Sequence, residues 1–180
     1  MVDRRQRKTR LIAASAMLSA LGVVLIAAAA LLDVLDLTMA ALASLLTVFA
    51  VIEIGQFYPW LIFAVTGILS LILLPKNTGA YCYILFFGYY PMFKSVFERK
   101  LPKPLAWLCK FLVFNLGFSG YVFLLPILIT NEPFPGGWYI AAMYGGGNLL
   151  MLLYDLAMTK LITLYLIRLR DRLHISRWFR

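Results

Sequence analysis

The 180-residue chain is poor in charged residues, and it contains one histidine and two cysteines. Charged residues make up 14% of the chain, whereas soluble globular proteins contain about 25%. Apolar residues make up 63%, and the mean hydropathy is +0.86. This composition excludes a soluble globular domain, and so much apolar surface also excludes a disordered chain. We therefore expect a single integral membrane domain over residues 1–180.

The scarcity of histidine and cysteine bounds the chemistry. His174 lies in a basic tail, and Cys82 and Cys109 are expected near opposite ends of adjacent spans, too far apart to pair. We predict no disulfide, no metal site and no cofactor. The sequence has no Gly-x-Ser-x-Gly or His-Glu-x-x-His motif and no Walker lysine loop. The residues therefore indicate a protein that is not an enzyme.

Apolar runs separated by charged or Pro/Gly segments predict an all-α, six-helix membrane bundle. The predicted spans are residues 11–32, 37–57, 60–74, 80–97, 105–129 and 138–166. The first run is too long for a signal-peptide core, so we expect it to be retained. The third run is short for a membrane span. Pro91 is expected to kink the fourth.

The distribution of lysine and arginine predicts the orientation. With the N-terminus on the cytoplasmic side, 16 of the 17 basic residues fall on that side, and Lys76 alone falls outside. Such asymmetry is typical of cytoplasmic loops and termini. Both termini are therefore expected in the cytoplasm, and the net charge of +9 is expected to contact anionic lipid rather than nucleic acid.

Four charged residues are expected at similar depths inside the bundle. They are the acids Glu53 and Asp155 and the bases Lys94 and Lys110. Charges within spans are costly and usually pair across helices. Two interpretations stay open, namely structural neutralisation or a network that senses a partner on the cytoplasmic side.

A second polar set is expected in the outer half, together with aromatic residues. Its members are Asn148, Asp36, Asp33, Asn77, Tyr81, Tyr121, Glu132, Trp138 and Tyr139. Aromatic walls with a few polar groups suit a small ring-bearing solute, but tyrosine and tryptophan also gather at membrane interfaces without binding anything. The glycines 145–147 next to Asn148 predict either close helix packing or backbone that faces a ligand.

Small residues recur along the first predicted span. Ala13, Ala16 and Ala20 include an Ala-x-x-x-Ala spacing close to the basic N-terminal segment. Small side chains four residues apart form a smooth face on which another helix can lie. We therefore predict that this face is a partner interface.

The chain resembles the substrate-binding S components of energy-coupling factor (ECF) transporters. The resemblance lies in the length, the six predicted helices, the Ala16-x-x-x-Ala20 face and the outer position of the candidate site. The stretches Leu35–Ser44 and Tyr154–Ile162 also look like uncharacterised bacterial membrane proteins of that superfamily.

This resemblance implies a subunit of a bacterial cell membrane that captures a vitamin-like solute from outside. It also implies that a transmembrane T component contacts the small face of the first helix and that cytoplasmic ATPases supply the energy. Two alternatives stay open. One is a scaffold or regulatory subunit with no transported solute, and the other is a lipid-processing enzyme.

Overall fold

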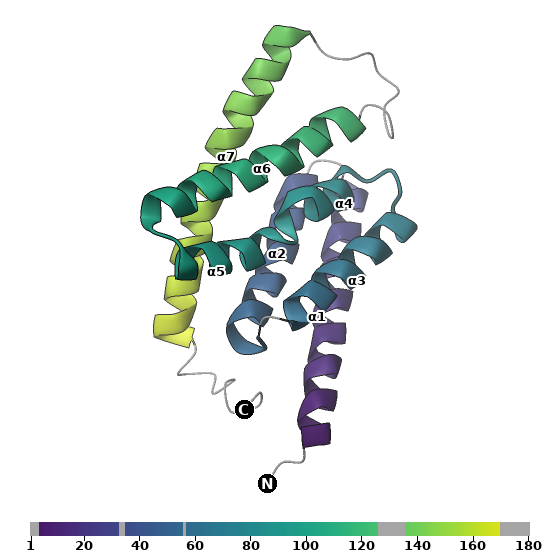
Figure 1. The fold of residues 1–180 in the computed structure, drawn as a ribbon. Helices are drawn as coiled ribbons and strands as arrows, with labels where there is room; N and C mark the ends of the chain where they lie inside the picture. The colour runs from purple at the N-terminus through teal and green to yellow at the C-terminus, as the bar shows by residue number, and fades with distance from the viewer. Residues whose placement is uncertain (1–3, 33–34, 56, 126–135, 170–180) are drawn as a thin grey trace.

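The computed structural model describes residues 4–32, 35–55, 57–125 and 136–169, and this part of the chain is built of helices and short connections, without strands (Figure 1). The prediction of an all-α fold is confirmed for these residues. In chain order the elements are α1 (Arg4–Leu32), α2 (Asp36–Glu53), α3 (Tyr58–Leu73), α4 (Thr78–Cys82), the π-helical turn η1 (Tyr83–Phe87), α5 (Tyr90–Lys100), α6 (Lys103–Leu125), α7 (Gly137–Leu164) and a second π-helical turn, η3 (Tyr165–Leu169).

Among the described residues, four helices are long and apolar enough to cross a membrane. The qualifying segments lie in α1, in α2, in α6 and in α7 continued by η3. Helix α3 is apolar but has only 16 residues. The predicted fourth span is divided among α4, η1 and α5. The structure therefore supports four such helices and leaves the count of six a prediction.

The helix ends follow local backbone chemistry. Helix α1 begins at Arg4, before the apolar run, because hydropathy marks the buried part of a helix while Arg, Gln and Lys are good helix formers. Helix α5 ends at Lys100, just before Leu101 and Pro102, because the residue before a proline disfavours the helical conformation. Asn77 caps α4 by accepting a hydrogen bond from the Ala80 amide at 3.0 Å.

The predicted fourth span is interrupted in the middle. The Gly88 amide donates to the Tyr83 carbonyl at 2.7 Å, which closes a wide π-helical turn. Regular helix resumes at Tyr90, with Pro91 in the first turn, where a proline is tolerated. The kink expected at Pro91 thus corresponds to a break just before it.

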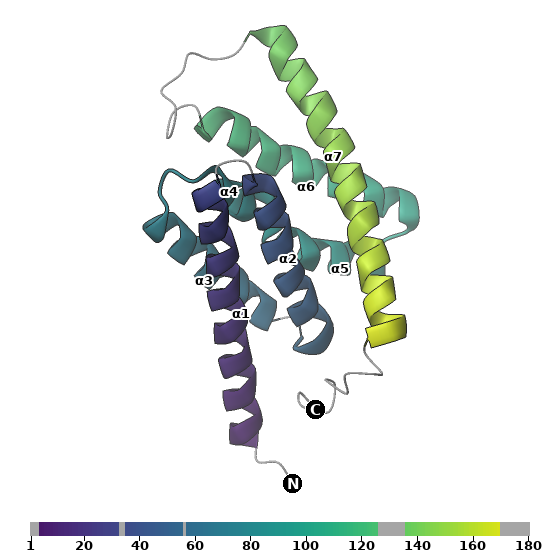
Figure 2. The same ribbon diagram turned by 180° about the vertical axis from the view of Figure 1, so that it is seen from behind.

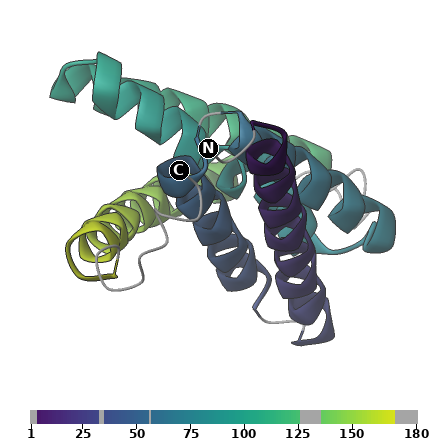
Figure 3. The same cartoon turned by 90° about the horizontal axis from the view of Figure 1, so that it is seen from below.

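The helices are splayed rather than parallel. Helices α1 and α2 lie side by side, and α3 and α7 lie on opposite sides of that pair (Figures 1 and 3). Helix α6 runs obliquely across the directions of α1 and α7 (Figures 1 and 2). The first turns of α7 project beyond the other helices, which leaves Trp138 and Tyr139 exposed.

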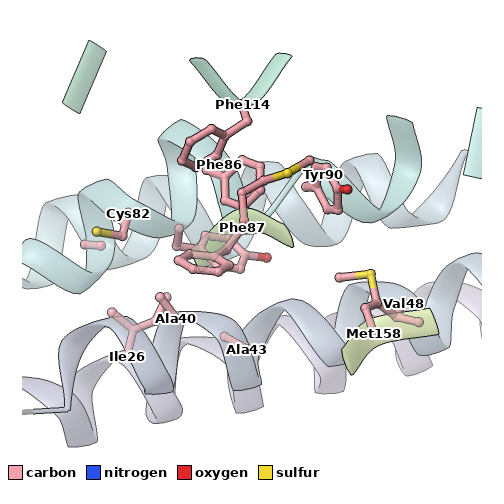
Figure 4. Close-up of a cluster of buried hydrophobic side chains, with 13 residues drawn as sticks. Ile26, Ala40, Ala43, Val48, Cys82, Phe86, Phe87, Tyr90, Phe114 and Met158 are labelled. Atoms are coloured by element: carbon pink, nitrogen blue, oxygen red, sulfur yellow. The ribbon is translucent and has the colours of Figure 1, made fainter. Parts of the chain in front are cut away.

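The core is a layer of aromatic rings over a floor of small residues. Phe86 and Phe87 of η1 lie over Ala40 and Ala43 of α2 (Figure 4). The alanines are almost fully buried and let the rings approach the helix backbone. Phe114 of α6 packs edge-on against Phe86 at 4.9 Å between ring centroids. These contacts pack η1 between α2 and α6.

The two ends of the molecule differ in charge. Helix α1 begins with exposed basic residues, and η3 ends near Arg168. The Tyr165 hydroxyl donates to Glu53 Oε1 at 3.2 Å, which places η3, the continuation of α7, beside the end of α2. We call this the basic end. The opposite end, where α1 stops and α2 and α4 begin, is called the far end.

Candidate functional site

A buried charge cluster joins α5, α6 and α7. Asp155 of α7 accepts hydrogen bonds from Lys94 at 2.5 Å and Tyr90 at 2.6 Å, both on Oδ1, and from Lys110 at 3.0 Å on Oδ2. Lys94 also donates to the Thr159 hydroxyl at 2.7 Å. Asp155 and both lysines are at most 3% exposed. A single carboxylate therefore ties three helices together.

The second acid of this cluster is Glu98. Its carboxylate lies 2.9 Å from Lys94 Nζ and 2.6 Å from Lys110 Nζ, and its side chain is 45% exposed. Two acids and two bases cancel in charge, as buried ionic groups require. Glu53, the acid predicted for this role, lies instead at the end of α2, where it bonds with Tyr165.

Helices α6 and α7 share two further polar contacts beyond the charge cluster. The amides of Asn115 and Asn148 exchange hydrogen bonds of 3.0 and 3.2 Å. The hydroxyls of Ser119 and Tyr144 lie 2.6 Å apart. Together with Lys110–Asp155 these pairs form the α6–α7 polar seam. Asn148, one of the residues predicted to bind a solute, thus uses its side chain in a contact between two helices.

At the far end, Asp36 and Asn77 also bond with each other. The Asn77 amide donates to Asp36 Oδ1 at 2.9 Å, while its own oxygen caps α4. The Tyr81 hydroxyl donates to the Pro75 carbonyl at 3.0 Å. These predicted site residues therefore hold the connection between α3 and α4 against the start of α2. Asp33 and Glu132 lie outside the described residues.

A cavity of about 230 Å³ lies beside the polar seam, between η1, α6 and α7. Its lining is mostly apolar and comprises Leu37, Cys82, Leu85, Phe86, Phe87, Phe114, Gly117, Phe118, Tyr121, Met143, Gly146, Gly147 and Leu150. Cys82 and Leu37 belong to elements that begin at the far end, so the cavity lies nearer that end than the charge cluster does.

One wall of the cavity is aromatic. Phe114, Phe118 and Tyr121 follow one face of α6, and their rings stack in a row with interplanar angles of 18° and 15°. On the α7 side, a side chain at Gly146 would meet open space, whereas one at Gly147 would press on the Phe118 ring. Close packing, one of the two predicted roles, is seen at Gly147, which lets a ring approach α7, while Gly146 borders the cavity and its role toward a ligand stays a prediction.

Of the outer residues predicted to bind a solute, Tyr121 alone among those described lines this cavity. Trp138 and Tyr139 are exposed on the projecting part of α7 and contact each other edge-on. The phenylalanines of the wall were missed by sequence analysis. Their spacing on α6 was the available signal, but a buried core gives the same pattern.

The small residues of α1 divide into two faces. Ser15, Ser19 and Gly22 are buried, and Ser19 accepts a hydrogen bond from Thr66 of α3 at 3.3 Å. The predicted partner face points the other way, and its residues Ala13, Ala16 and Ala20 are exposed. The described residues of the chain therefore do not cover this face.

Both cysteines are free thiols, and the described residues contain no group of His, Cys, Asp or Glu suited to a metal ion. The geometry instead offers an apolar cavity that could receive a small molecule and an ion cluster that holds the helices around it. Comparison with known proteins finds no matching family model, no matching curated protein and no matching solved structure.

Proposed function

We propose that this chain is a multi-pass membrane subunit that binds a small solute in the cavity between η1, α6 and α7 for uptake into the cell. The cavity itself is the observation that supports the proposal. It is lined mainly by apolar and aromatic side chains of η1, α6 and α7, with one residue each from α2 and α4, and lies toward the end opposite the basic segments. Sites for small molecules are usually concave and mostly apolar in this way.

In the proposed topology the chain crosses the membrane six times with both termini in the cytoplasm. Helix α3 forms a short third span, and α4, η1 and α5 together form a broken fourth span. Broken helices occur at binding sites of transporters, where irregular backbone lines a cavity. The basic residues at the start of α1 and in η3 support this orientation.

The proposal divides the work of transport among separate chains. This subunit binds the solute, a transmembrane partner contacts the exposed face Ala13, Ala16 and Ala20, and cytoplasmic ATPases drive release. The exposure of that face supports this assignment, since the opposite face of α1 is already covered by α3. The charge cluster would hold α7 in place while the cavity is loaded.

Native mass spectrometry tests solute binding. We expect the gently solubilised protein to carry a stoichiometric small-molecule adduct that is lost in Gly146→Leu, because the new side chain fills the cavity. Gly145→Leu is the matched control, since its side chain would also meet open space but does not line the cavity. An identical set of lipid adducts in all three proteins would contradict the proposal.

Site-specific photo-crosslinking tests the partner face. A benzophenone amino acid at Ala16 should form a product with a second membrane protein that copurifies with nucleotide-binding subunits. The same probe at Leu108, which is exposed on α6, should not form that product. Crosslinks from Ala16 to lipid or to a second copy of the chain alone would contradict the assignment.

One observation favours the scaffold alternative. Asp36, Asn77 and Asn148 hydrogen-bond within the chain, so three of the polar groups expected to meet a solute are engaged elsewhere. A scaffold needs these contacts and no ligand. The Gly146→Leu experiment separates the two functions, because a scaffold would tolerate a filled cavity without losing an adduct.

A further inference from the structure

The chemistry of the cavity wall constrains the ligand more closely than its size does. Among the described residues that line it, no side chain carries a charge, and the polar side-chain groups are the Cys82 thiol and the Tyr121 hydroxyl. These two groups lie beside each other and therefore mark one polar end. A thiol is a weak hydrogen-bonding partner, so the Tyr121 hydroxyl can still form a stronger hydrogen bond with a polar group of a ligand.

The shape of the cavity adds a second constraint. Three stacked rings on α6 form an aromatic wall, and the absence of a side chain at Gly146 leaves room on α7. Flat rings pack well against such a wall in offset or edge-on geometry. The volume of about 230 Å³ exceeds the roughly 150 Å³ known to accept benzene. A bicyclic ring system is therefore a fitting size.

We infer that the cavity takes an uncharged, planar ring compound with a single hydrogen-bonding group, and that Tyr121 is the residue that selects for this group. The inference rests on the proposed function and names its substrate class. An ionised ligand is disfavoured because its charge would leave water without a partner of opposite charge in the wall. Asp36 at the far end bonds with the neutral amide of Asn77, and its carboxylate disfavours an anionic ligand further.

Three naphthalene probes test this inference. They are naphthalene, 2-naphthol and 2-naphthoate, which share one ring system and differ in having no polar group, one hydroxyl or one carboxylate. Affinities are measured by probe fluorescence with the full chain in lipid nanodiscs. Nanodiscs containing Gly146→Leu report partition into lipid, which is subtracted.

We expect 2-naphthol to bind about two- to tenfold more tightly than naphthalene, as one net hydrogen bond allows. We expect 2-naphthoate to bind at least about tenfold more weakly than 2-naphthol. In Tyr121→Phe the ring and its stacking remain while the hydroxyl is lost, so the naphthol-to-naphthalene ratio should fall to about one with naphthalene binding unchanged.

Two results would overturn the inference. In the first, the probes bind and Gly146→Leu abolishes this binding, but 2-naphthoate is preferred or the naphthol-to-naphthalene affinity ratio is unchanged in Tyr121→Phe. This result leaves the proposed function standing. The second is the absence of any probe signal beyond that of Gly146→Leu. In that case the proposed function falls as well only if native mass spectrometry finds no adduct that depends on Gly146. Thermal unfolding of each variant checks that it is folded.

Discussion

The interface between α6 and α7 differs sharply between its two halves. Toward the basic end, Lys110 and Asp155 form a buried ion pair in which Lys94 and Tyr90 also take part. Toward the far end, the same two helices are joined by the uncharged pairs Asn115–Asn148 and Ser119–Tyr144, and an apolar cavity lies beside these pairs, next to Phe118 and Gly146. Buried charges join the helices in one half, whereas in the other half neutral hydrogen bonds join them and the missing side chain at Gly146 leaves space beside the contact.

This contrast teaches that a cavity between helices needs directional contacts of the same helices to keep it open. Apolar packing gives no strong preference for one separation in a lipid environment, because lipid tails are as apolar as the side chains. Hydrogen-bonded pairs have a fixed length and therefore fix the separation. The α6–α7 polar seam is then the frame that keeps the cavity open.

The largest effect is expected from Asp155→Asn. This change leaves Lys94 and Lys110 buried with one shared acid, Glu98, and should lower the free energy of unfolding by about 3–5 kcal/mol. Unfolding by sodium dodecyl sulfate in mixed micelles measures the loss. The double change Lys94→Met with Asp155→Asn should lose less than the single change. A loss below about 1 kcal/mol for Asp155→Asn would show that the frame does not depend on it.

A steric change should come next, at the crossing of α6 and η1. In Gly117→Ala the new methyl group would overlap the Leu85 carbonyl oxygen and approach the Tyr89 hydroxyl. We expect a destabilisation of about 1–3 kcal/mol. Gly145→Ala is the control, and it should be neutral or stabilising by up to about 1 kcal/mol. Equal thermal unfolding of the two variants would refute a close approach at Gly117.

The amide pair of the seam should contribute less. A double-mutant cycle with Asn115→Ala and Asn148→Ala should give a coupling energy of about 0.6 kcal/mol and no more than about 1.7 kcal/mol, the range measured for hydrogen bonds between membrane helices. Unfolding of the two single variants and the double variant supplies the cycle. Additive losses would mean that the two amides do not bond in the membrane.

The smallest effect is expected at the exposed acid of the cluster. Glu98→Gln should cost less than about 1 kcal/mol, because this side chain is 45% exposed and both lysines keep Asp155. Measured beside Asp155→Asn, it compares two acids that face the same lysines and differ in burial. If Glu98→Gln lowered the free energy of unfolding as much as Asp155→Asn does, burial would not explain the difference between the two acids.

Part of this architecture could be predicted from the sequence. Runs of apolar residues and the breaks at Pro75 and Pro102 place the helices, and the depths of Lys94, Lys110 and Asp155 bring those three residues together. Glu53 was expected at the same depth, but it lies beside Tyr165, which is farther along the chain than Asp155 and nearer the basic end. Counting residues gives the depth only for a helix that runs straight across the membrane, whereas the tilt of each helix depends on how the helices pack.

The cavity could not be predicted for a related reason. Phe114, Phe118 and Tyr121 have the spacing of a helix face, and a helix face of aromatic residues can meet lipid, core or ligand equally well. The partner of Asn148 could likewise not be predicted, because Asn115 lies next to it only where α6 and α7 cross. The sequence names the polar groups but not the pairs that they form.

The wide turn at Tyr83–Phe87 sets the direction in which the side chains after it point relative to those before it. Each residue of an α-helix advances by about 100°, so one residue more in a turn rotates everything after it by that angle relative to everything before it. Cys82 lies before the turn and lines the cavity, while Tyr90 and Lys94 lie after it and reach Asp155. Deleting one residue within the turn would leave the composition, hydropathy and length of the chain nearly unchanged. It would nevertheless rotate Tyr90 and Lys94 away from α7. The spacing within this turn, more than the identity of its residues, lets one helical segment serve both the cavity and the ion cluster.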